Sequence, residues 1–198
     1  MYDDYVALIF DMDGTLVDSG QLHEFGWRAT LNKYHLPIDG PFMRSLAGVP
    51  TKETLEILIQ KFGVKVQASL DEMNDFKEQC VRDNVQRFVK PTALFELVKH
   101  YHGKKPMAIG TGADTAEALL VLKQCGLEPY LDVVVGSDQV KHPKPAPDTF
   151  LRCAELLGVD PRQCVVFEDA KLGLQAATSA GMAAVDVFLT HNIYNDYF

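Results

Sequence analysis

Two groups of acidic residues each follow a short apolar run in this sequence. Asp11-Met12-Asp13-Gly14-Thr15 comes directly after the run Val6 to Phe10, and Glu168-Asp169 comes directly after the run Cys164 to Phe167. Runs of this length that are rich in β-branched residues are typical of buried parallel strands. Because ligands of open α/β sheets bind outside the carboxyl ends of the strands, the sequence predicts that both acidic groups lie at one site.

A hydroxyl and a lysine follow two further predicted strands. Thr111-Gly112 comes after the run Pro106 to Gly110, and Lys144 lies in the proline-rich segment that follows Asp132 to Val135. A threonine hydroxyl can donate a hydrogen bond to a phosphoryl oxygen, and a lysine can neutralise charge that develops during phosphoryl transfer. Gly14 and Gly112 have no side chain that would keep backbone amides from the same anion. These residue types predict a site for a phosphorylated ligand.

The acidic groups also predict a metal ion. Carboxylates gathered at one point repel one another and raise each other's pKa unless a cation lies between them. Mg²⁺ fits this role, because it prefers oxygen ligands and commonly takes one or two carboxylates, waters and a substrate phosphate. Asp11 and Asp169 are the natural protein ligands in this sequence.

Hydrolysis of a phosphate monoester is the reaction that such a site suits. The uncatalysed reaction is among the slowest known, and a carboxylate nucleophile divides it into two steps through a covalent phosphoenzyme. A second carboxyl can protonate the leaving alcohol and later take a proton from water. Asp11 and Asp13 are two residues apart, so an extended backbone would place both side chains on one face. The sequence alone leaves open whether Asp13 keeps that geometry.

The elements that position these residues form an α/β pattern. Five apolar runs are predicted strands: Val6 to Phe10, Pro106 to Gly110, Asp132 to Val135, Cys164 to Phe167 and Ala183 to Phe188. Helical patterns lie between the later runs, one opening at Asp114 and ending at Gly126, another opening at Pro147-Asp148 and ending near Gly158. Alternation of strand and helix predicts a doubly wound parallel sheet.

The stretch from residue 19 to residue 88 has helical patterns and no convincing strand. Leu55, Leu58, Ile59 and Phe62 form one apolar helix face that Gly63 would end, and Ser69-x-x-Glu72 predicts the start of the next helix. We therefore predict an all-helical domain at 19–88, inserted into an α/β core formed by 1–18 and 89–198. The chain would return to the core around Lys90-Pro91.

Composition limits the partners of the protein. The 198 residues include 19 basic and 27 acidic side chains, and the net charge of −8 disfavours nucleic acid and anionic membranes. The four widely spaced cysteines predict buried thiols in a reducing cytoplasm, and neither a secretory signal nor a membrane span is predicted. We expect a cytoplasmic monomer or weak homo-oligomer that binds a small phosphorylated metabolite.

The motifs resemble those of haloacid dehalogenase-type phosphohydrolases, and among them the β-phosphoglucomutase-like sugar phosphatases. Asp11 to Asp18 matches the signature D-x-D-G-T-x-x-D, Thr111 matches the hydroxyl position, Lys144-Pro145 the lysine, and Glu168-Asp169 the acidic pair. The resemblance covers nearly the whole chain. The segments Val140 to Phe150 and Cys164 to Ala170 look most like bacterial fructose-1-phosphatase-like members.

This resemblance implies a role for each residue. Asp11 would be the nucleophile and Asp13 the general acid and base, with Thr111 and Lys144 completing the catalytic group. Mg²⁺ would be held by Asp11, the backbone carbonyl of Asp13 and Asp169, with support from Glu168. The inserted helices would be a cap that closes over the substrate. The predicted substrate-binding residues are Gly14, Thr15, His23, Thr51, Lys52 and Gly112.

Two other functions share these residues. A phosphomutase would return the phosphoryl group to another hydroxyl of the sugar and needs a cation in the cap to grip the distal phosphate. In the resembling mutases an arginine follows a cap loop, and the matching stretch Ala47 to Lys52 has Thr51 at that place with Lys52 beside it. A non-catalytic phospho-receiver also uses Asp, Thr and Lys around Mg²⁺, but it lacks both the second aspartate and the inserted helices. We therefore expect hydrolysis of a small sugar phosphate, fructose 1-phosphate being the first to test.

Overall fold

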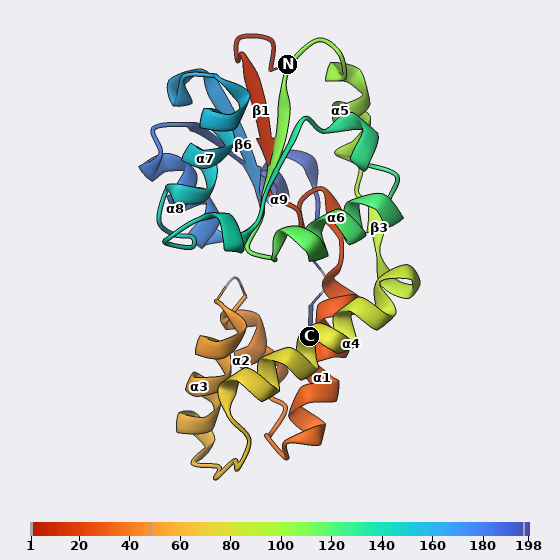
Figure 1. Ribbon diagram of the computed structural model, residues 1–198, viewed down its shortest axis with the longest axis vertical. Coiled ribbons are helices and arrows are strands. Elements are labelled where there is room, and N and C mark those ends of the chain that lie inside the picture. Colours follow the sequence, from red (N-terminus) through yellow and green to blue (C-terminus); the bar gives the residue numbers. More distant parts are fainter. Residues whose placement is uncertain (1, 48, 196) are drawn as a thin grey trace. The chain divides into compact units, whose positions relative to one another are not determined.

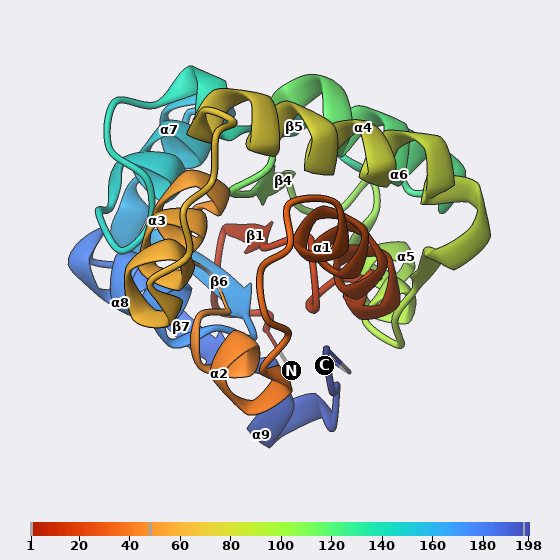
Figure 2. The same ribbon diagram turned by 90° about the horizontal axis from the view of Figure 1, so that it is seen from below.

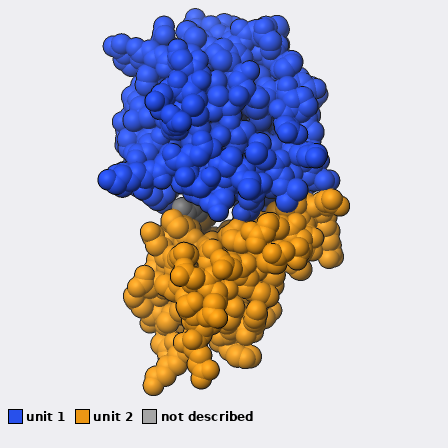
Figure 3. Space-filling view, in the orientation of Figure 1, with its two compact units in different colours: residues 1–19, 89–195 blue, residues 20–88, 196–198 orange. Residues whose placement is uncertain are grey.

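The chain folds into two compact units. The computed structural model describes residues 2–47, 49–195 and 197–198 (Figure 1). Unit 1 consists of Met1–Ser19 and Val89–Asn195, and unit 2 consists of Gly20–Phe88 with Asp196–Phe198 (Figure 3). No helix within the described ranges is long and apolar enough to cross a membrane.

A parallel five-stranded sheet lies at the centre of unit 1. Its strands are β1 (Ala7–Phe10), β4 (Met107–Gly110), β5 (Val133–Val135), β6 (Cys164–Glu168) and β7 (Ala183–Asp186). They run in the order β5-β4-β1-β6-β7, so β1 is central and pairs with β4 on one side and β6 on the other. β1, β4 and β6 are buried along their whole length, which explains why they read as continuous apolar runs.

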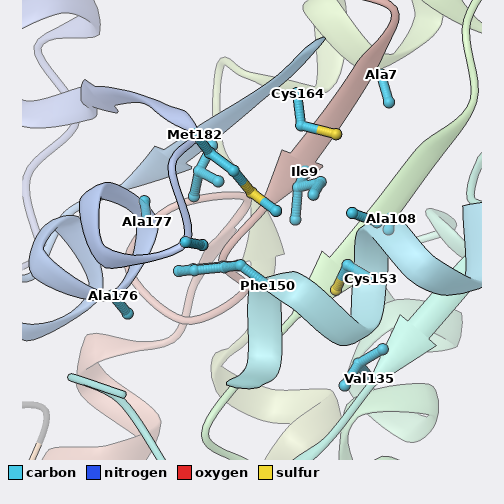
Figure 4. Close-up of a cluster of buried hydrophobic side chains, with 13 residues drawn as sticks. Ala7, Ile9, Ala108, Val135, Phe150, Cys153, Cys164, Ala176, Ala177 and Met182 are labelled. Atoms are coloured by element: carbon cyan, nitrogen blue, oxygen red, sulfur yellow. The ribbon is translucent and has the colours of Figure 1, made fainter. Parts of the chain in front are cut away.

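Helices cover both faces of this sheet, as the strand and helix alternation predicts. They are α5 (Phe95–Tyr101), α6 (Thr115–Gln124), α7 (Asp148–Leu157), α8 (Lys171–Ser179) and α9 (Val187–His191). Figure 2 shows α7 and α8 on one side of the sheet and α5 and α6 on the other. Phe150 and Cys153 of α7 pack with Ile9 of β1 and Ala108 of β4 in one buried cluster (Figure 4). The prediction of a doubly wound α/β core is confirmed.

The last predicted strand ends earlier than the sequence suggested. The apolar run was expected to form a strand through Phe188, but β7 ends at Asp186 and α9 begins at Val187. The Asp186 side chain accepts a hydrogen bond from the Leu189 backbone amide at 3.1 Å, so it caps α9. An apolar run does not by itself distinguish a buried strand from a short helix, and the cap decides between them here.

A two-stranded antiparallel ribbon marks the place where the chain leaves and re-enters unit 1. β2 (Val17–Asp18) pairs with β3 (Lys90–Pro91), with Val17 opposite Pro91. The Thr92 backbone amide donates to the Leu16 carbonyl at 2.9 Å, and the Thr92 hydroxyl donates to the Thr15 carbonyl at 2.7 Å. The predicted return of the chain around Lys90-Pro91 therefore coincides with this ribbon.

Unit 2 is built from helices. They are α1 (Gly20–Lys33), α2 (Gly40–Ser45), α3 (Thr51–Phe62) and α4 (Leu70–Phe88). Their apolar faces form a second core that includes Trp27, Leu31, Leu55, Leu58 and Met73. Ser69 and Glu72 exchange hydrogen bonds of 2.8 and 3.2 Å in the capping arrangement that the sequence predicts at the start of α4. Tyr197 and Phe198 pack against this core, although the sequence assigned them to the α/β part.

Candidate active site

Three carboxylates meet at the carboxyl ends of β1 and β6. The two strands are paired with Phe10 opposite Phe167, and the Asp11 amide donates to the Phe167 carbonyl at 2.9 Å. Asp11 therefore leaves the sheet beside Glu168 and Asp169. One carboxylate oxygen from each of the three residues lies within 4.8 Å of the others. The structure thus brings together the two acidic groups that the sequence places after separate strands.

Lys144 joins two of these carboxylates. It lies in the loop between β5 and α7, and its Nζ donates to Asp11 Oδ1 and to Glu168 Oε2, both at 2.7 Å. The side chain is only 12% exposed, so the two ion pairs are shielded from water. Lys144 is therefore part of the charge cluster and is not a solvated lysine of the loop.

The charge cluster changes the acidity of all its members. Burial, and then the charge of Glu168, raises the pKa of Asp11 to about 7. Burial and the charge of Asp11 raise the pKa of Asp169 to about 6, and burial also raises the pKa of Glu168. Burial opposes the charged form of Lys144, but Asp11 and Glu168 together raise its pKa above the usual value. One ammonium group does not compensate two buried carboxylates and one half-buried carboxylate, so the cluster favours the binding of a further cation.

The loop after Asp11 turns sharply. The amides of Leu16 and Val17 both donate to the Met12 carbonyl, at 3.0 and 2.9 Å, so the chain folds back toward Met12 after Gly14. The Ser19 hydroxyl donates to the Asp13 carboxylate through a hydrogen bond of 2.6 Å, which holds that side chain. Asp13 nevertheless lies near enough to Asp11 to contribute to the raised pKa of Asp11.

Two glycines allow close contacts around the acidic pair. Gly14 has φ +81°, and a Cβ there would lie 2.3 Å from Asp169 Oδ2. A Cβ on Gly173, in the first turns of α8, would lie 1.8 Å from Glu168 Oε2. Any larger residue at either place would displace a carboxylate of the site. Gly14 was predicted to be functional, whereas Gly173 was missed because a glycine inside a helix carries no chemical signal of its own.

Thr111 and Gly112 lie at the end of β4 as predicted. The Thr111 amide donates to the Val135 carbonyl at 3.0 Å, and its hydroxyl accepts from the Ala113 amide at 3.1 Å, which leaves the hydroxyl hydrogen available for a ligand. The space where Gly112 would carry a Cβ is open, with no atom within 4 Å.

Thr15 is placed differently from the other predicted ligand-binding residues. Its side chain is fully buried, and its hydroxyl has no hydrogen-bond partner among the described residues. Its carbonyl accepts the hydrogen bond from the Thr92 hydroxyl, next to the two-stranded ribbon of unit 1. The structure thus gives Thr15 a contact with the ribbon through its main chain.

The remaining predicted residues belong to unit 2. His23 lies on α1, and Thr51 and Lys52 are the first two residues of α3. Lys52 Nζ forms an ion pair with Asp71 Oδ1 at 2.6 Å, and both side chains are more than half exposed. Gly48, which belongs to the predicted cap loop, lies outside the described residues.

Comparison with known proteins agrees with this arrangement. A family model described as a haloacid dehalogenase-like hydrolase matches residues 5–181. The chain is 48% identical to fructose-1-phosphate phosphatase YqaB of Escherichia coli, over 96% of this chain and all of that protein. It is 35% identical to a phosphorylated carbohydrates phosphatase of Thermotoga maritima, over 90% of this chain and 83% of that one.

Solved structures show the same architecture. The chain superimposes on β-phosphoglucomutase from Clostridium difficile with a TM-score of 0.79 and 26% sequence identity, over 91% of this chain and 83% of that one. The prediction of a haloacid dehalogenase-like phosphatase, which rested on the strand-end motifs, is therefore confirmed. The chain belongs to the haloacid dehalogenase-like hydrolase family.

Proposed function

We propose that this protein hydrolyses the phosphate monoester of a small sugar through an aspartyl-phosphate on Asp11. The observation that carries the proposal is the position of Asp11, which is buried at the end of the central strand and bridged by Lys144 to Glu168. The four residues that the sequence singled out for catalysis, Asp11, Asp13, Thr111 and Lys144, all lie at the strand ends or in the loops that follow them.

We propose Mg²⁺ as the cofactor, held by Asp11, the Asp13 backbone carbonyl and Asp169, with support from Glu168. The donor set fits this ion, because it consists of carboxylate and carbonyl oxygens and three of the carboxylates already lie within 4.8 Å of one another. When bound, the ion would neutralise the carboxylates and withdraw charge from the phosphoryl group. The lysine alone leaves the cluster with a surplus of negative charge, which supports the need for a divalent cation.

The reaction would proceed in two steps, transfer of the phosphoryl group to Asp11 and its release to water. In the first, an Asp11 carboxylate oxygen attacks phosphorus, the bond between phosphorus and the sugar oxygen breaks, and Asp13 gives its proton to the departing oxygen. In the second, Asp13 takes a proton from water, the resulting hydroxide attacks phosphorus, and inorganic phosphate leaves while the Asp11 carboxylate is restored. The Ser19 hydroxyl, donating to Asp13, would hold the acid and base carboxyl in place during both steps.

Lys144 and the strand-end donors would stabilise charge in this reaction. The ammonium of Lys144 contacts Asp11 Oδ1, so it lies next to the attacking group when negative charge moves to the phosphoryl oxygens. The Thr111 hydroxyl would donate a hydrogen bond to a phosphoryl oxygen. The space beside Gly112 is open, so its backbone could contact the same phosphoryl group. The Gly14 backbone belongs to the same rim of the sheet, and we propose that it contacts the phosphate as well.

The relatives support a sugar phosphate as substrate. The Escherichia coli relative carries the name fructose-1-phosphate phosphatase, and the Thermotoga maritima relative is named for phosphorylated carbohydrates. We propose fructose 1-phosphate as the first substrate to test. We also propose that unit 2 is a cap over the site and that His23 and Thr51 read the leaving sugar.

A phosphomutase is the second candidate, because the fold is shared with β-phosphoglucomutase from Clostridium difficile. Such an enzyme needs a cation in the cap to hold a second phosphate. Thr51 offers no charge, and the charge of Lys52 is partly neutralised by Asp71 at 2.6 Å. This ion pair favours hydrolysis over transfer between sugar hydroxyls.

The four cysteines are free thiols, three of them buried, which supports a reducing compartment. We propose that the enzyme acts in the cytoplasm, as a monomer or weak homo-oligomer.

An assay with two substrates tests the proposed function. The enzyme is supplied with fructose 1-phosphate and, separately, with β-glucose 1-phosphate and a trace of glucose 1,6-bisphosphate, while inorganic phosphate and glucose 6-phosphate are followed together. We expect phosphate release from fructose 1-phosphate to be the fastest reaction. Faster formation of glucose 6-phosphate than of phosphate from any substrate would establish the mutase instead.

A further inference from the structure

The C-terminal segment of unit 1 ends beside the acidic pair. After α9 the chain reaches Asn195, whose side-chain Nδ2 donates to Asp169 Oδ2 at 3.2 Å. The same amide lies against the loop that carries the catalytic aspartates, since a Cβ on Gly14 would be 2.4 Å from Asn195 Nδ2. Asn195 thus contacts both halves of the site, the loop after β1 and the loop after β6.

The segment that carries Asn195 is anchored within unit 1. Ile193 is buried, with 8% of its surface exposed, and its amide donates to the Val187 carbonyl at 3.3 Å. The preceding helix α9 is held at its end by a hydrogen bond of 2.9 Å between the Tyr2 hydroxyl and His191 Nε2. Asn195 follows the buried Ile193 by two residues, so the packing of Ile193 limits how far the Asn195 side chain can move from Asp169.

Asp169 differs from the other two carboxylates in the kind of partner it has. Lys144 forms ion pairs with Asp11 and Glu168, whereas Asp169 accepts from the neutral amide of Asn195. A neutral donor fixes the orientation of a carboxylate without bringing a positive charge that competes with a metal ion.

We propose that Asn195 is a positioning residue of the metal site: its amide holds Asp169 Oδ2 so that Oδ1 serves as the ligand of the divalent cation. The proposal rests on the metal site described under the proposed function. Loss of a partner that orients a metal ligand commonly lowers metal affinity about 10-fold to 100-fold. Because the Asn195 side chain is exposed, we expect the lower end, a loss of about 10-fold.

Calorimetric titration with Mg²⁺, in the absence of any substrate, tests this role. Four proteins are compared: the wild type, Asn195→Ala, Asn195→Gln and the control Tyr194→Ala. Tyr194 is exposed, precedes Asn195 directly and packs its ring against Phe188, so its removal disturbs the same segment without touching Asp169. We expect weaker Mg²⁺ binding in Asn195→Ala, partial recovery in Asn195→Gln, and wild-type binding in Tyr194→Ala.

The Mg²⁺ concentration that gives half-maximal phosphatase activity should rise in Asn195→Ala by the same factor as the dissociation constant. Thermal unfolding in chelator should give wild-type melting temperatures for the Asn195 variants, because the contact serves the metal rather than the fold.

Equal Mg²⁺ affinity of wild type and Asn195→Ala would overturn the positioning role while leaving the proposed function intact. Equal weakening in Tyr194→Ala would also overturn it, since the whole segment rather than the amide would then matter. A wild type that binds no Mg²⁺ would overturn the proposed metal site itself.

Discussion

The two lysines that the sequence predicts at the site, Lys144 in unit 1 and Lys52 in unit 2, have opposite surroundings. Lys144 is buried between Asp11 and Glu168, at 2.7 Å from each. In unit 2 the predicted phosphate-binding Lys52 forms an ion pair at the surface with Asp71. Buried and connected charges act strongly on each other, whereas exposed pairs are weakened by water and salt. We infer that the chemical step depends on unit 1 and that unit 2 contributes recognition.

The largest expected effect follows from replacing the nucleophile. Asp11→Asn should lower kcat by at least about 10⁴-fold, because an amide neither attacks phosphorus effectively nor serves as a strong magnesium ligand. Steady-state hydrolysis of fructose 1-phosphate is the measurement. Asp4→Asn, which changes an exposed aspartate of unit 1, is the matched control and should keep wild-type activity. Retention of a tenth of the wild-type rate by Asp11→Asn would remove Asp11 from the nucleophile role.

Lys144→Ala should have the second largest effect. We expect kcat to fall by about 10²-fold to 10³-fold, as for other groups that stabilise charge in a transition state. Stability should also fall by about 3–5 kcal/mol at pH 8, because two buried carboxylates lose their common cation. Urea unfolding and steady-state kinetics measure the two effects. Lys141→Ala, which removes an exposed lysine from the same loop, should change neither quantity, and a similar loss in both variants would contradict the role of Lys144.

The pH dependence of stability should also reveal the buried cluster. The pKa of Asp11 is raised to about 7 and that of Asp169 to about 6, so below neutral pH the folded state binds more protons at these sites than the unfolded state. In chelator, the free energy of unfolding should therefore contain a contribution that decreases from pH 5 to pH 8. Urea unfolding at several pH values measures it. Asp11→Asn should show a smaller decrease and should be more stable than the wild type at pH 8; an unchanged slope would contradict the raised pKa of Asp11.

The smallest expected effect concerns the surface pair of unit 2. Lys52→Ala should change kcat/KM for fructose 1-phosphate by less than about 3-fold, because exposed ion pairs contribute little. Asp71→Ala releases the same lysine from its partner and serves as the reciprocal variant. Steady-state kinetics with both variants is the measurement. If unit 2 bound the phosphate through Lys52, kcat/KM of Lys52→Ala would instead fall by roughly 100-fold or more, as for the loss of a desolvated phosphate contact.

The sequence predicted the α/β core and the main acidic residues for a definite physical reason. A buried parallel strand is a continuous apolar run, and the residue that ends it must lie at the rim of the sheet, as Asp11 and Thr111 do. Lys144 was assigned by its order after the third predicted strand and by the match of Lys144-Pro145 to the family's lysine, and the structure adds its two ion pairs.

Residues whose contribution comes from packing could not be found in this way. Gly173 matters because α8 passes close to Glu168, and a lone glycine in a helical pattern does not reveal that approach. Ser19 reaches Asp13 only because the intervening chain folds back on the Met12 carbonyl. Asn195 follows a helix that the sequence assigned partly to a strand, so its contact with Asp169 depends on an element that was not predicted.

Trapping the covalent intermediate tests the central claim most directly. Asp13→Asn should still accept a phosphoryl group on Asp11 from a reactive acyl phosphate but release it slowly, because the base that activates water is missing. Peptide mass spectrometry should find one hydroxylamine-sensitive phosphoryl group on the peptide that contains Asp11. Because Asp13 is replaced in this variant, Asp11 is the only aspartate left in the segment Phe10 to Leu16. A phosphoryl group on a histidine or serine, or stable to hydroxylamine, would contradict the account.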